Sequence, residues 1–214
     1  MMQAAEDDEI FVYMGGDQVV PNDVRRVRID RSVKVIPQRA FEHRTHLIDV
    51  EFHDDVEIIE EYAFNFCKNL RGPIKLLGVK IIEYGAFKYC SGLTDVEFGL
   101  IDLDLPEGLE TIQRFAFDGC ESLRRIAIPL NCTIGRDAFE CGEKLATIDL
   151  VGGIHKTIAS LHLERWRNDM KDEINQIHQI LLDTHSFYLT GTIQRWIGSV
   201  IHKMSITKWS TKKY

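Results

Sequence analysis

The residues best suited to chemistry are cysteines that recur at one position of a repeated pattern. Cys67, Cys90 and Cys120 each follow an Ala-Phe dipeptide at the same distance, and Arg44 and Gly142 stand at the equivalent positions elsewhere. A structural metal site would need closely spaced ligand pairs, and the sequence contains no C-x-x-C. We therefore expect a row of small buried apolar side chains, with redox sensing as the alternative.

A second group with metal-binding chemistry lies in one short stretch, which contains His43, His46, His53, Asp54 and Asp55. The spacing of the first two histidines suits zinc on a helix, but here the pair falls on a return turn. The sequence has no phosphate-binding loop, dinucleotide fingerprint, nucleophile elbow or H-E-x-x-H motif. We therefore expect no catalytic residues, no metal and no cofactor, and thus a protein that is not an enzyme.

The cysteines and histidines described above lie within a segment that is repeated along the chain, so the fold of the repeat must position them. The segment IIEEYAFNFCKNL at 58–70 is nearly duplicated as IIEYGAFKYCSGL at 81–93. Ala-Phe occurs in five registers, with isoleucine four residues before each alanine and leucine seven residues after it. The alanines are Ala40, Ala63, Ala86, Ala116 and Ala138. The phenylalanines that follow them are predicted to be buried and stacked as one column.

Each repeat is predicted to contain two short strands joined by turns. After each leucine the residues alternate with the period of a strand, as in LTDVEF at 93–98 and LATIDL at 145–150. Serine, aspartate, glycine or asparagine then occupies a turn position. A unit of about 23 residues cannot bury its own apolar side, so we predict that the copies stack into a solenoid.

Two repeats depart from this pattern. The segment LRGPIKL at 70–76 carries one extra residue, and Pro73 cannot donate a ladder hydrogen bond, so we expect a bulge or irregular strand there. The spacing between Ala86 and Ala116 is 30 residues, and two strand registers compete in that interval, at 93–98 and at 100–105. The insertion is expected to loop out, either as a tolerated surface insertion or as a binding loop.

The pattern I-x-x-x-A-F-x-x-C-x-x-L-x-x-[VI]-x-[FIL] resembles the BspA-type leucine-rich repeat over roughly residues 20–153. The resemblance implies a solenoid of stacked parallel short strands that is used for protein–protein contact. Bacterial surface members carry a secretion signal that this N-terminus does not match, so their adhesive role is not carried over. The segments SLHLERWRNDM and IQRWIGSVI are similar to tails of diatom members, for which no chemistry is assigned.

The composition changes near residue 154. Residues 1–153 carry a net charge of −11 and residues 154–214 a net charge of +4, and all three tryptophans lie in the second part. From about residue 160, apolar residues recur at helical spacing in two runs, separated by DTHSFYLTG. These runs predict a helical hairpin that caps the last coil near Leu150, with Trp166 and Trp196 at least partly buried. The alternative is a helix pair for docking or dimerisation.

The expected fold class is therefore α+β, a leucine-rich-repeat solenoid capped by a C-terminal helical hairpin. Three parts are expected along the chain. They are a disordered acidic N-terminus at 1–9, the solenoid at 10–153, and the hairpin with a frayed basic tail at 154–214.

We predict a protein-binding face on the outward side chains of the strands. Charges alternate from strand to strand, so that Arg28 should face Glu51, Glu51 should face Lys75, and Lys75 should face Glu97. A nucleic-acid surface would need a basic stripe, so the expected partner is another protein with its own mixed-charge pattern. The candidate residues are Arg26, Arg28, Asp49, Glu51, Asp95, Glu97, Arg125 and Asp149.

The expected function is a non-enzymatic protein–protein interaction module that is a monomer. The alternative is a structural or assembly subunit docked into a larger complex through its C-terminal helices.

The N-terminus MMQAAEDDEIF has no basic n-region or apolar h-region, and no apolar run approaches about 18 residues. We therefore expect a cytoplasmic protein, with the nucleus as an alternative, that is neither secreted nor bound to a membrane or to nucleic acid.

Overall fold

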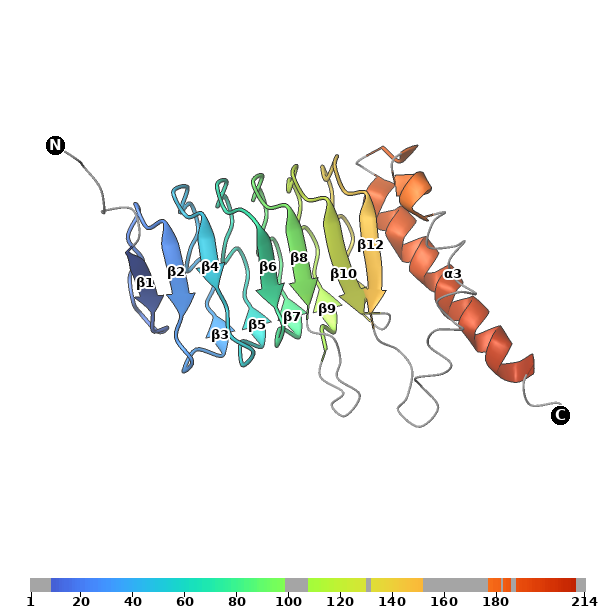
Figure 1. Cartoon of the computed structure of the whole chain (residues 1–214), viewed down its shortest axis with the longest axis horizontal. Coiled ribbons are helices and arrows are strands. Elements are labelled where there is room, and N and C mark those ends of the chain that lie inside the picture. The colour runs from blue at the N-terminus through green and yellow to red at the C-terminus, as the bar shows by residue number, and fades with distance from the viewer. Residues whose placement is uncertain are drawn as a thin grey trace.

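The computed structural model is an elongated stack of β-coils with helical structure at its C-terminal end (Figure 1). It describes residues 9–98, 108–129, 132–151, 177–181, 183–185 and 188–210. Longer strands line one side of the stack and very short strands line another (Figure 1). The predicted α+β solenoid with a helical cap is confirmed.

The strands of the described residues form three sheets, and every pairing is parallel. The longer strands are β1 (Ile10–Tyr13), β2 (Arg26–Ile29), β4 (Asp49–Glu51), β6 (Pro73–Leu76), β8 (Asp95–Phe98), β10 (Arg125–Pro129) and β12 (Thr147–Val151). The short strands are β3 (Val35–Ile36), β5 (Ile58–Ile59), β7 (Ile81–Ile82), β9 (Thr111–Ile112) and β11 (Thr133–Ile134). The first sheet is β1-β2-β4, the second is β6-β8-β10-β12, and the short strands form the third.

The phenylalanines of the five Ala-Phe dipeptides form one buried column. Their exposed fractions are 0 to 1 %. Successive ring centroids lie 4.8, 5.1, 5.4 and 5.7 Å apart, with the ring planes within 9° of parallel. The rings are those of Phe41, Phe64, Phe87, Phe117 and Phe139, so the predicted column is confirmed.

Backbone hydrogen bonds join each Ala-Phe corner to the next. The amide of Phe64 donates to the carbonyl of Ala86 at 2.7 Å, and the amide of Phe87 donates to the carbonyl of Ala116 at 2.8 Å. Both alanine side chains are fully buried. A methyl group at this position lets neighbouring coils approach closely enough for the hydrogen bond, which explains why alanine recurs.

The extra residue before Pro73 divides the longer strands into two sheets. Gly72 adopts a positive φ of 76°, and Pro73 then begins β6. At the equivalent position of another coil, the amide of Asp49 donates to the carbonyl of Arg25 at 3.3 Å. Proline lacks this amide hydrogen, so β4 and β6 fall in separate sheets. The irregularity predicted at Pro73 is confirmed.

The strand before the insertion adopts the first of its two competing registers. β8 pairs in step with β6, with Val96 opposite Ile74. The second register, at 100–105, and the proposed binding loop lie outside the described residues.

The helix α3 (Leu189–Ser210) closes the C-terminal end of the stack (Figure 1). Its residues Leu189, Ile193 and Val200 join the solenoid core. Residues 177–181 are helical as well. Trp196 is 9 % exposed, as expected, whereas Trp166 and the side chain of Leu150 lie outside the described residues.

Side chains of α3 take the place of backbone groups that a further coil would supply. In earlier coils the phenylalanine amide donates to the alanine carbonyl of the next coil, but the amide of Phe139 donates to the Thr190 hydroxyl at 3.0 Å. The carbonyl of each earlier short strand accepts an amide of the next coil, but the carbonyl of Ile134 accepts the side-chain amide of Gln194 at 2.6 Å. The helix therefore satisfies buried backbone groups of the last coil as well as covering its apolar surface.

Gln18 protects the opposite end of the stack. Its side-chain oxygen accepts the amide of Met14 at 2.6 Å, and its nitrogen donates to the carbonyl of Val12 at 3.2 Å. Tyr13, which lies between these residues, bonds toward the next coil through Asp30. Alternate residues of a strand bond in opposite directions, so Gln18 occupies the edge of β1 with which none of the described strands pairs and where another chain could otherwise pair.

Candidate binding surfaces

The outward charges of β2 and β4 pair with each other. Arg26 stands opposite Asp49 and Arg28 opposite Glu51. The Arg28 Nε donates to the Glu51 carboxylate at 2.6 Å, and the Arg26 guanidinium lies 3.4 Å from the Asp49 carboxylate. The predicted facing of Arg28 and Glu51 is confirmed. Exposed ion pairs of this kind contribute only about 0.2–1 kcal/mol each.

No strand pairing continues the predicted charge ladder from Glu51 to Lys75. These residues lie on β4 and β6, which belong to separate sheets and share no strand pairing. The two strands still lie beside each other, but Pro73 interrupts the ladder that would have set the register, so this step stays a prediction.

The second sheet restores the alternation of charge. Lys75 stands opposite Glu97, as predicted, and Asp95 stands opposite Arg125. The side chains of Glu97 and Asp149 lie outside those that the structure describes. The strand face therefore consists of two charged patches, one on β2 and β4 and the other on the sheet from β6 to β12.

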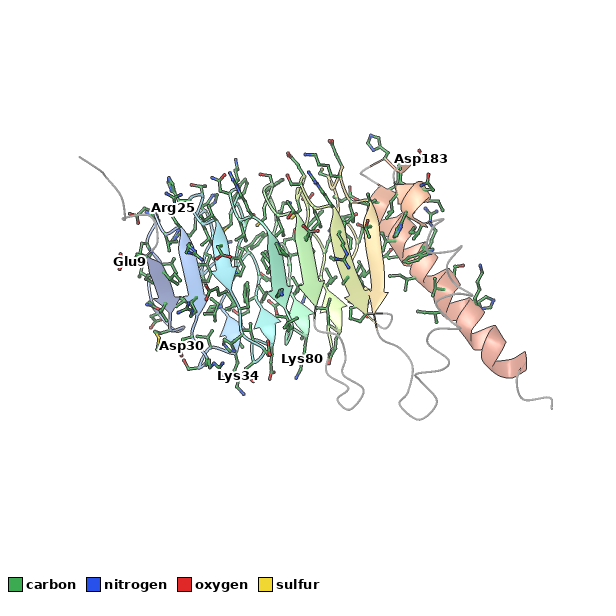
Figure 2. All side chains as sticks on the ribbon, in the orientation of Figure 1. Glu9, Arg25, Asp30, Lys34, Lys80 and Asp183 are labelled. Carbon is green, nitrogen blue, oxygen red and sulfur yellow. The ribbon has the colours of Figure 1, made fainter. Side chains whose placement is uncertain are left out.

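Charges of both signs also line the rims of the stack (Figure 2). Arg25 projects from one rim, and Asp30, Lys34 and Lys80 project from the other (Figure 2). The Lys80 amine lies 3.7 Å from the Glu57 carboxylate. Nucleic-acid surfaces gather basic side chains on one face, and the described rims instead mix the two signs.

An aromatic surface, which the strand-face prediction missed, lies on the Ala-Phe side of the stack. Its first row comprises His43, Phe66 and Tyr89, which all stand three residues after the repeat alanine. Their ring centroids are 4.8 and 4.6 Å apart. Tyr89 is 38 % exposed, and His43 is also exposed.

A second row of rings runs beside the first and comprises Tyr62, Tyr84 and Phe115. Its centroids are 5.3 and 5.6 Å apart, and each pair meets edge to face. We call the two rows together the aromatic face. For the first row the signal was present in the sequence as aromatic residues at a shared repeat position, whereas Tyr84 of the second row stands one residue away from the position of Tyr62 and Phe115. The sequence alone does not tell whether such residues are buried or exposed.

Lys88 joins the two rows. Its Nζ lies 4.9 Å from the ring centroid of Tyr89 and 4.4 Å from that of Phe115. It also pairs with the Asp118 carboxylate at 2.9 Å. Burial disfavours the charge of Lys88, but the hydrogen bond and charge of Asp118 outweigh that effect and raise its pKa. The ammonium group therefore stays charged between the rings.

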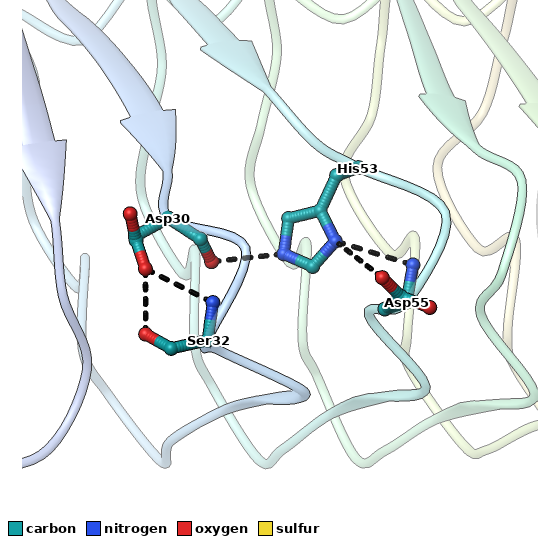
Figure 3. A network of polar contacts seen from close by, with 4 residues as sticks. All are labelled: Asp30, Ser32, His53 and Asp55. Carbon is teal, nitrogen blue, oxygen red and sulfur yellow. Dashed lines mark hydrogen bonds and ion pairs between the residues drawn. The ribbon is translucent and has the colours of Figure 1, made fainter.

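A polar network at the lower rim contains the residue types of a hydrolase triad (Figure 3). The Ser32 hydroxyl, however, donates to the Asp30 carboxylate at 2.6 Å, and this bond leads the contacts that lower the pKa of Asp30. His53 donates from Nε2 to the carbonyl of Asp30 at 2.9 Å and accepts the amide of Asp55 at Nδ1. The histidine therefore ties two turns together, whereas a triad needs its base to contact the nucleophile.

The metal-binding interpretation of the histidine stretch finds no geometric support. His43 stacks on Phe66, and His53 uses both ring nitrogens in the turns. Within the described residues no three histidine, cysteine, aspartate or glutamate side chains converge as metal ligands.

The thiols of Cys67, Cys90 and Cys120 form a buried row. Each is fully buried and donates to the carbonyl of a phenylalanine one coil earlier, at 3.0 to 3.2 Å. Burial raises the pKa of Cys67 to about 12 and raises the pKa values of Cys90 and Cys120 as well. The thiolate is the reactive form, so these properties favour the predicted packing role over redox sensing.

We expect only Cys141 to react quickly with a thiol reagent in the native protein at about pH 8, because it alone among the five cysteines is partly exposed. All five should react in denaturant. A thiol whose pKa is higher in the folded state than in the unfolded state contributes to the stability of the fold. That contribution is complete below the unfolded pKa of about 9. Stability should therefore fall above about pH 9, as the pH approaches the folded pKa of Cys67.

Quantitative labelling and urea titrations at about pH 8 and pH 10 would check this expectation. A Cys141→Ser variant is the control and should abolish the fast native reaction. Fast labelling of further thiols in the native state would contradict the buried row.

A cavity of about 420 Å³ opens where α3 meets the last coil. Arg136, Glu140, Tyr188 and Arg195 are among its lining residues. Burial first, and the charges of Asp137 and Asp118 next, raise the pKa of Glu140. The side chains that line the cavity thus carry charges of both signs, and they do not indicate which class of ligand would bind there.

Comparisons with known proteins identify the repeat. A family model described as "BspA type Leucine rich repeat region (6 copies)" matches residues 22–100 and 97–165. No curated protein matches the chain. The chain is similar to a solved structure of a leucine rich cell surface protein from Faecalibacterium prausnitzii A2-165, with 24 % identity and a TM-score of 0.39. That match covers 60 % of this chain and 42 % of the other, so this chain spans less than half of that protein's length.

These matches do not extend to diatom proteins, so the similarity of the tail to diatom members stays a prediction. The described part of the chain contains no helix with the length and apolar character needed to cross a membrane.

Proposed function

Because the chain belongs to the BspA-type leucine-rich repeat family, we propose that it is a non-enzymatic module that binds another protein. The observation that carries this proposal is the fixed register of the outward strand residues. Arg26, Asp49, Asp95, Arg125 and their neighbours are held by paired backbones rather than by loops. A rigid surface loses little conformational entropy on binding, which favours recognition by a broad face.

The proposed contact surface is the strand face predicted from the sequence. Its two patches carry both charge signs, so a partner with a complementary mixed pattern would be accepted and a like-charged one rejected. The Arg28–Glu51 pair contributes little to folding because both side chains are largely exposed. A partner protein can therefore break that ion pair and contact Arg28 and Glu51 itself at a small cost in free energy.

The alternative, an assembly subunit docked through its C-terminal helices, has less geometric support. The apolar residues of α3 from Leu189 to Val200 are already buried in the solenoid core. Thr190 and Gln194 are occupied by backbone groups of the last coil. We therefore propose that the protein is a monomer. A mass above that of one chain in native mass spectrometry would instead indicate a subunit of an assembly. The free thiols of all five cysteines support a reducing compartment such as the cytoplasm.

Charge reversal tests the strand face. The partner would first be identified by affinity capture and mass spectrometry. Glu51→Lys, Glu97→Lys and Arg125→Glu should then each weaken binding by about tenfold or more, because like charges across an interface cost several kcal/mol. Binding would be measured by titration calorimetry, with circular dichroism to confirm that the fold is intact.

Lys34→Glu is the matched control, because Lys34 is exposed on the rim and not on the strand face (Figure 2). It should leave affinity unchanged. Folded variants that all retain full affinity would exclude the strand face and leave the 99–108 loop or the helical tail as the proposed contact surface.

A further inference from the structure

The two ends of the stack are closed in different ways (Figure 1). At the C-terminal end, α3 packs apolar side chains against the last coil. At the N-terminal end, β1 is the outermost strand of its sheet, and none of the described strands pairs with its outer edge. The side chain of Gln18 covers that edge instead. The outer edge of β1 is therefore a position where a further strand could pair.

The side chains of β1 that point away from the core are apolar, unlike those of the neighbouring strands. Tyr13 points inward and is buried, whereas Val12 is 40 % exposed. Ile10 and Met14 lie on the same side as Val12, because side chains alternate along a strand. Met14 is 56 % exposed. The outward positions of β2 and β4 carry two ion pairs instead, so the apolar row on β1 favours contact with another protein surface over contact with water.

The backbone groups of the same three residues face the outer edge. Tyr13 bonds toward the next coil, and alternate residues of a strand bond in opposite directions. Ile10, Val12 and Met14 therefore direct their amide and carbonyl groups away from β2. Donors and acceptors alternate along this edge, which is the pattern that an added strand requires.

Gln18 holds two of these backbone groups. Its Nε2 donates to the Val12 carbonyl at 3.2 Å, and its Oε1 accepts the Met14 amide at 2.6 Å. The turn that returns Gln18 to the strand contains Gly15 and Gly16, whose φ values of 81° and 60° favour glycine. The contact is solvent-exposed, so an incoming strand could replace both hydrogen bonds with backbone ones.

The edge of β1 is complementary to a second copy of itself. In an antiparallel pair centred on Val12, this residue stands opposite Val12 of the second copy, and Ile10 stands opposite Met14 of the second copy. The apolar row then meets an identical apolar row. The backbone groups match as well, because residues that stand opposite each other in such a pair exchange amide-to-carbonyl hydrogen bonds.

Three features make this pairing weak in the native chain. Each Gln18 must give up its two hydrogen bonds before the strands can pair. Glu9 directly precedes β1 and Asp17 lies in the following turn, so carboxylates of the two copies would approach each other. Stable interfaces bury about 800 Å² per partner, which is more than the edge of a four-residue strand offers. The native chain should therefore stay largely monomeric.

We propose that the outer edge of β1 is a pairing site for a second copy of this chain, and that Gln18 is the gate that restricts access to it. When Gln18 is displaced, two β1 strands pair antiparallel and join two β1-β2-β4 sheets into one. Both strand faces then lie on the same side of the joined sheet, which doubles the surface open to a partner protein. The pairing itself does not depend on what the strand face binds.

Sedimentation velocity of the full chain between about 10 µM and 1 mM tests the proposal. Gln18→Ala should form a discrete dimer, with a dissociation constant at least about tenfold below that of the native chain, because no side chain then competes for the edge. Gln18→Asn keeps the amide but shortens the side chain, and it should promote the dimer to a smaller extent. Adding Val12→Lys to Gln18→Ala should restore the monomer, because the two introduced charges would meet at the centre of the pair.

Gln38→Ala is the matched control, because Gln38 is an exposed glutamine on another coil. It should leave the chain monomeric. Glu51→Lys should leave the self-association of the Gln18→Ala chain unchanged even where it weakens partner binding, so the two proposals can fail separately. A Gln18→Ala chain that is folded by circular dichroism and stays monomeric up to about 1 mM would overturn the gate. A dimer that persists with Val12→Lys, or in which the Val12 amide still exchanges rapidly with solvent, would overturn the pairing site.

Discussion

Replacement of Phe87 by alanine should lower the free energy of unfolding by about 3–5 kcal/mol. The ring is fully buried at the centre of the column and stacks on Phe64 at 5.1 Å and on Phe117 at 5.4 Å. Single domains are typically stable by only about 5–15 kcal/mol, so this loss is a large fraction of the total. Coils of a solenoid contact only their neighbours, so a defect at the centre also uncouples the two halves.

Urea denaturation followed by circular dichroism would measure this loss. Tyr89→Ala is the matched control, because Tyr89 lies two residues away in the same coil and is 38 % exposed. It should cost about 1 kcal/mol or less. Similar costs for the two variants would contradict the buried column as the main source of stability.

Replacement of Ile193 by aspartate should release the helical cap. Ile193 is fully buried, and an unpaired charge at a buried site typically costs several kcal/mol. Release of α3 would also expose the amide of Phe139 and the carbonyl of Ile134, which Thr190 and Gln194 now satisfy. The variant should melt at a lower temperature and associate at micromolar concentration, because the open end of a solenoid is apolar.

Ser199→Asp tests whether any acidic residue in this helix has the same effect. Ser199 is exposed on α3, so its replacement should change the melting temperature little. Thr190→Val, which removes only a hydroxyl acceptor, should cost about 1–3 kcal/mol by leaving the Phe139 amide unpaired. A chain lacking residues 154–214 that stayed fully soluble and equally stable would exclude the cap role.

The repeat pattern was sufficient to predict the architecture. Isoleucine, Ala-Phe and leucine recur at fixed spacings, so each coil had to present the same apolar side to the next. The phenylalanine column and the buried cysteines follow directly from that shared register. The helical cap was predictable too, because its apolar residues recur at helical spacing beside an otherwise open end.

The candidate binding surfaces were only partly predictable. Arg28 faces Glu51 as expected, because that pairing depends on two regular strands. No strand pairing places Lys75 opposite Glu51, because the missing amide at Pro73 leaves β4 and β6 in separate sheets. The extra residue was visible in the sequence, but its effect on the sheet depends on contacts between coils.

The sequence by itself determined which residues are interior, because a buried repeat position tolerates only a few side chains of suitable size. Tertiary structure decided which rings of the aromatic face meet. The ring centroids of Phe66 and Tyr89 lie 4.6 Å apart because the two residues belong to neighbouring coils of the stack, and nothing local to either residue specifies that contact. It also decided that Thr190 and Gln194 complete the last coil. Hydrogen bonds between distant segments depend on how whole elements are placed relative to each other. The type and spacing of single residues do not specify that placement.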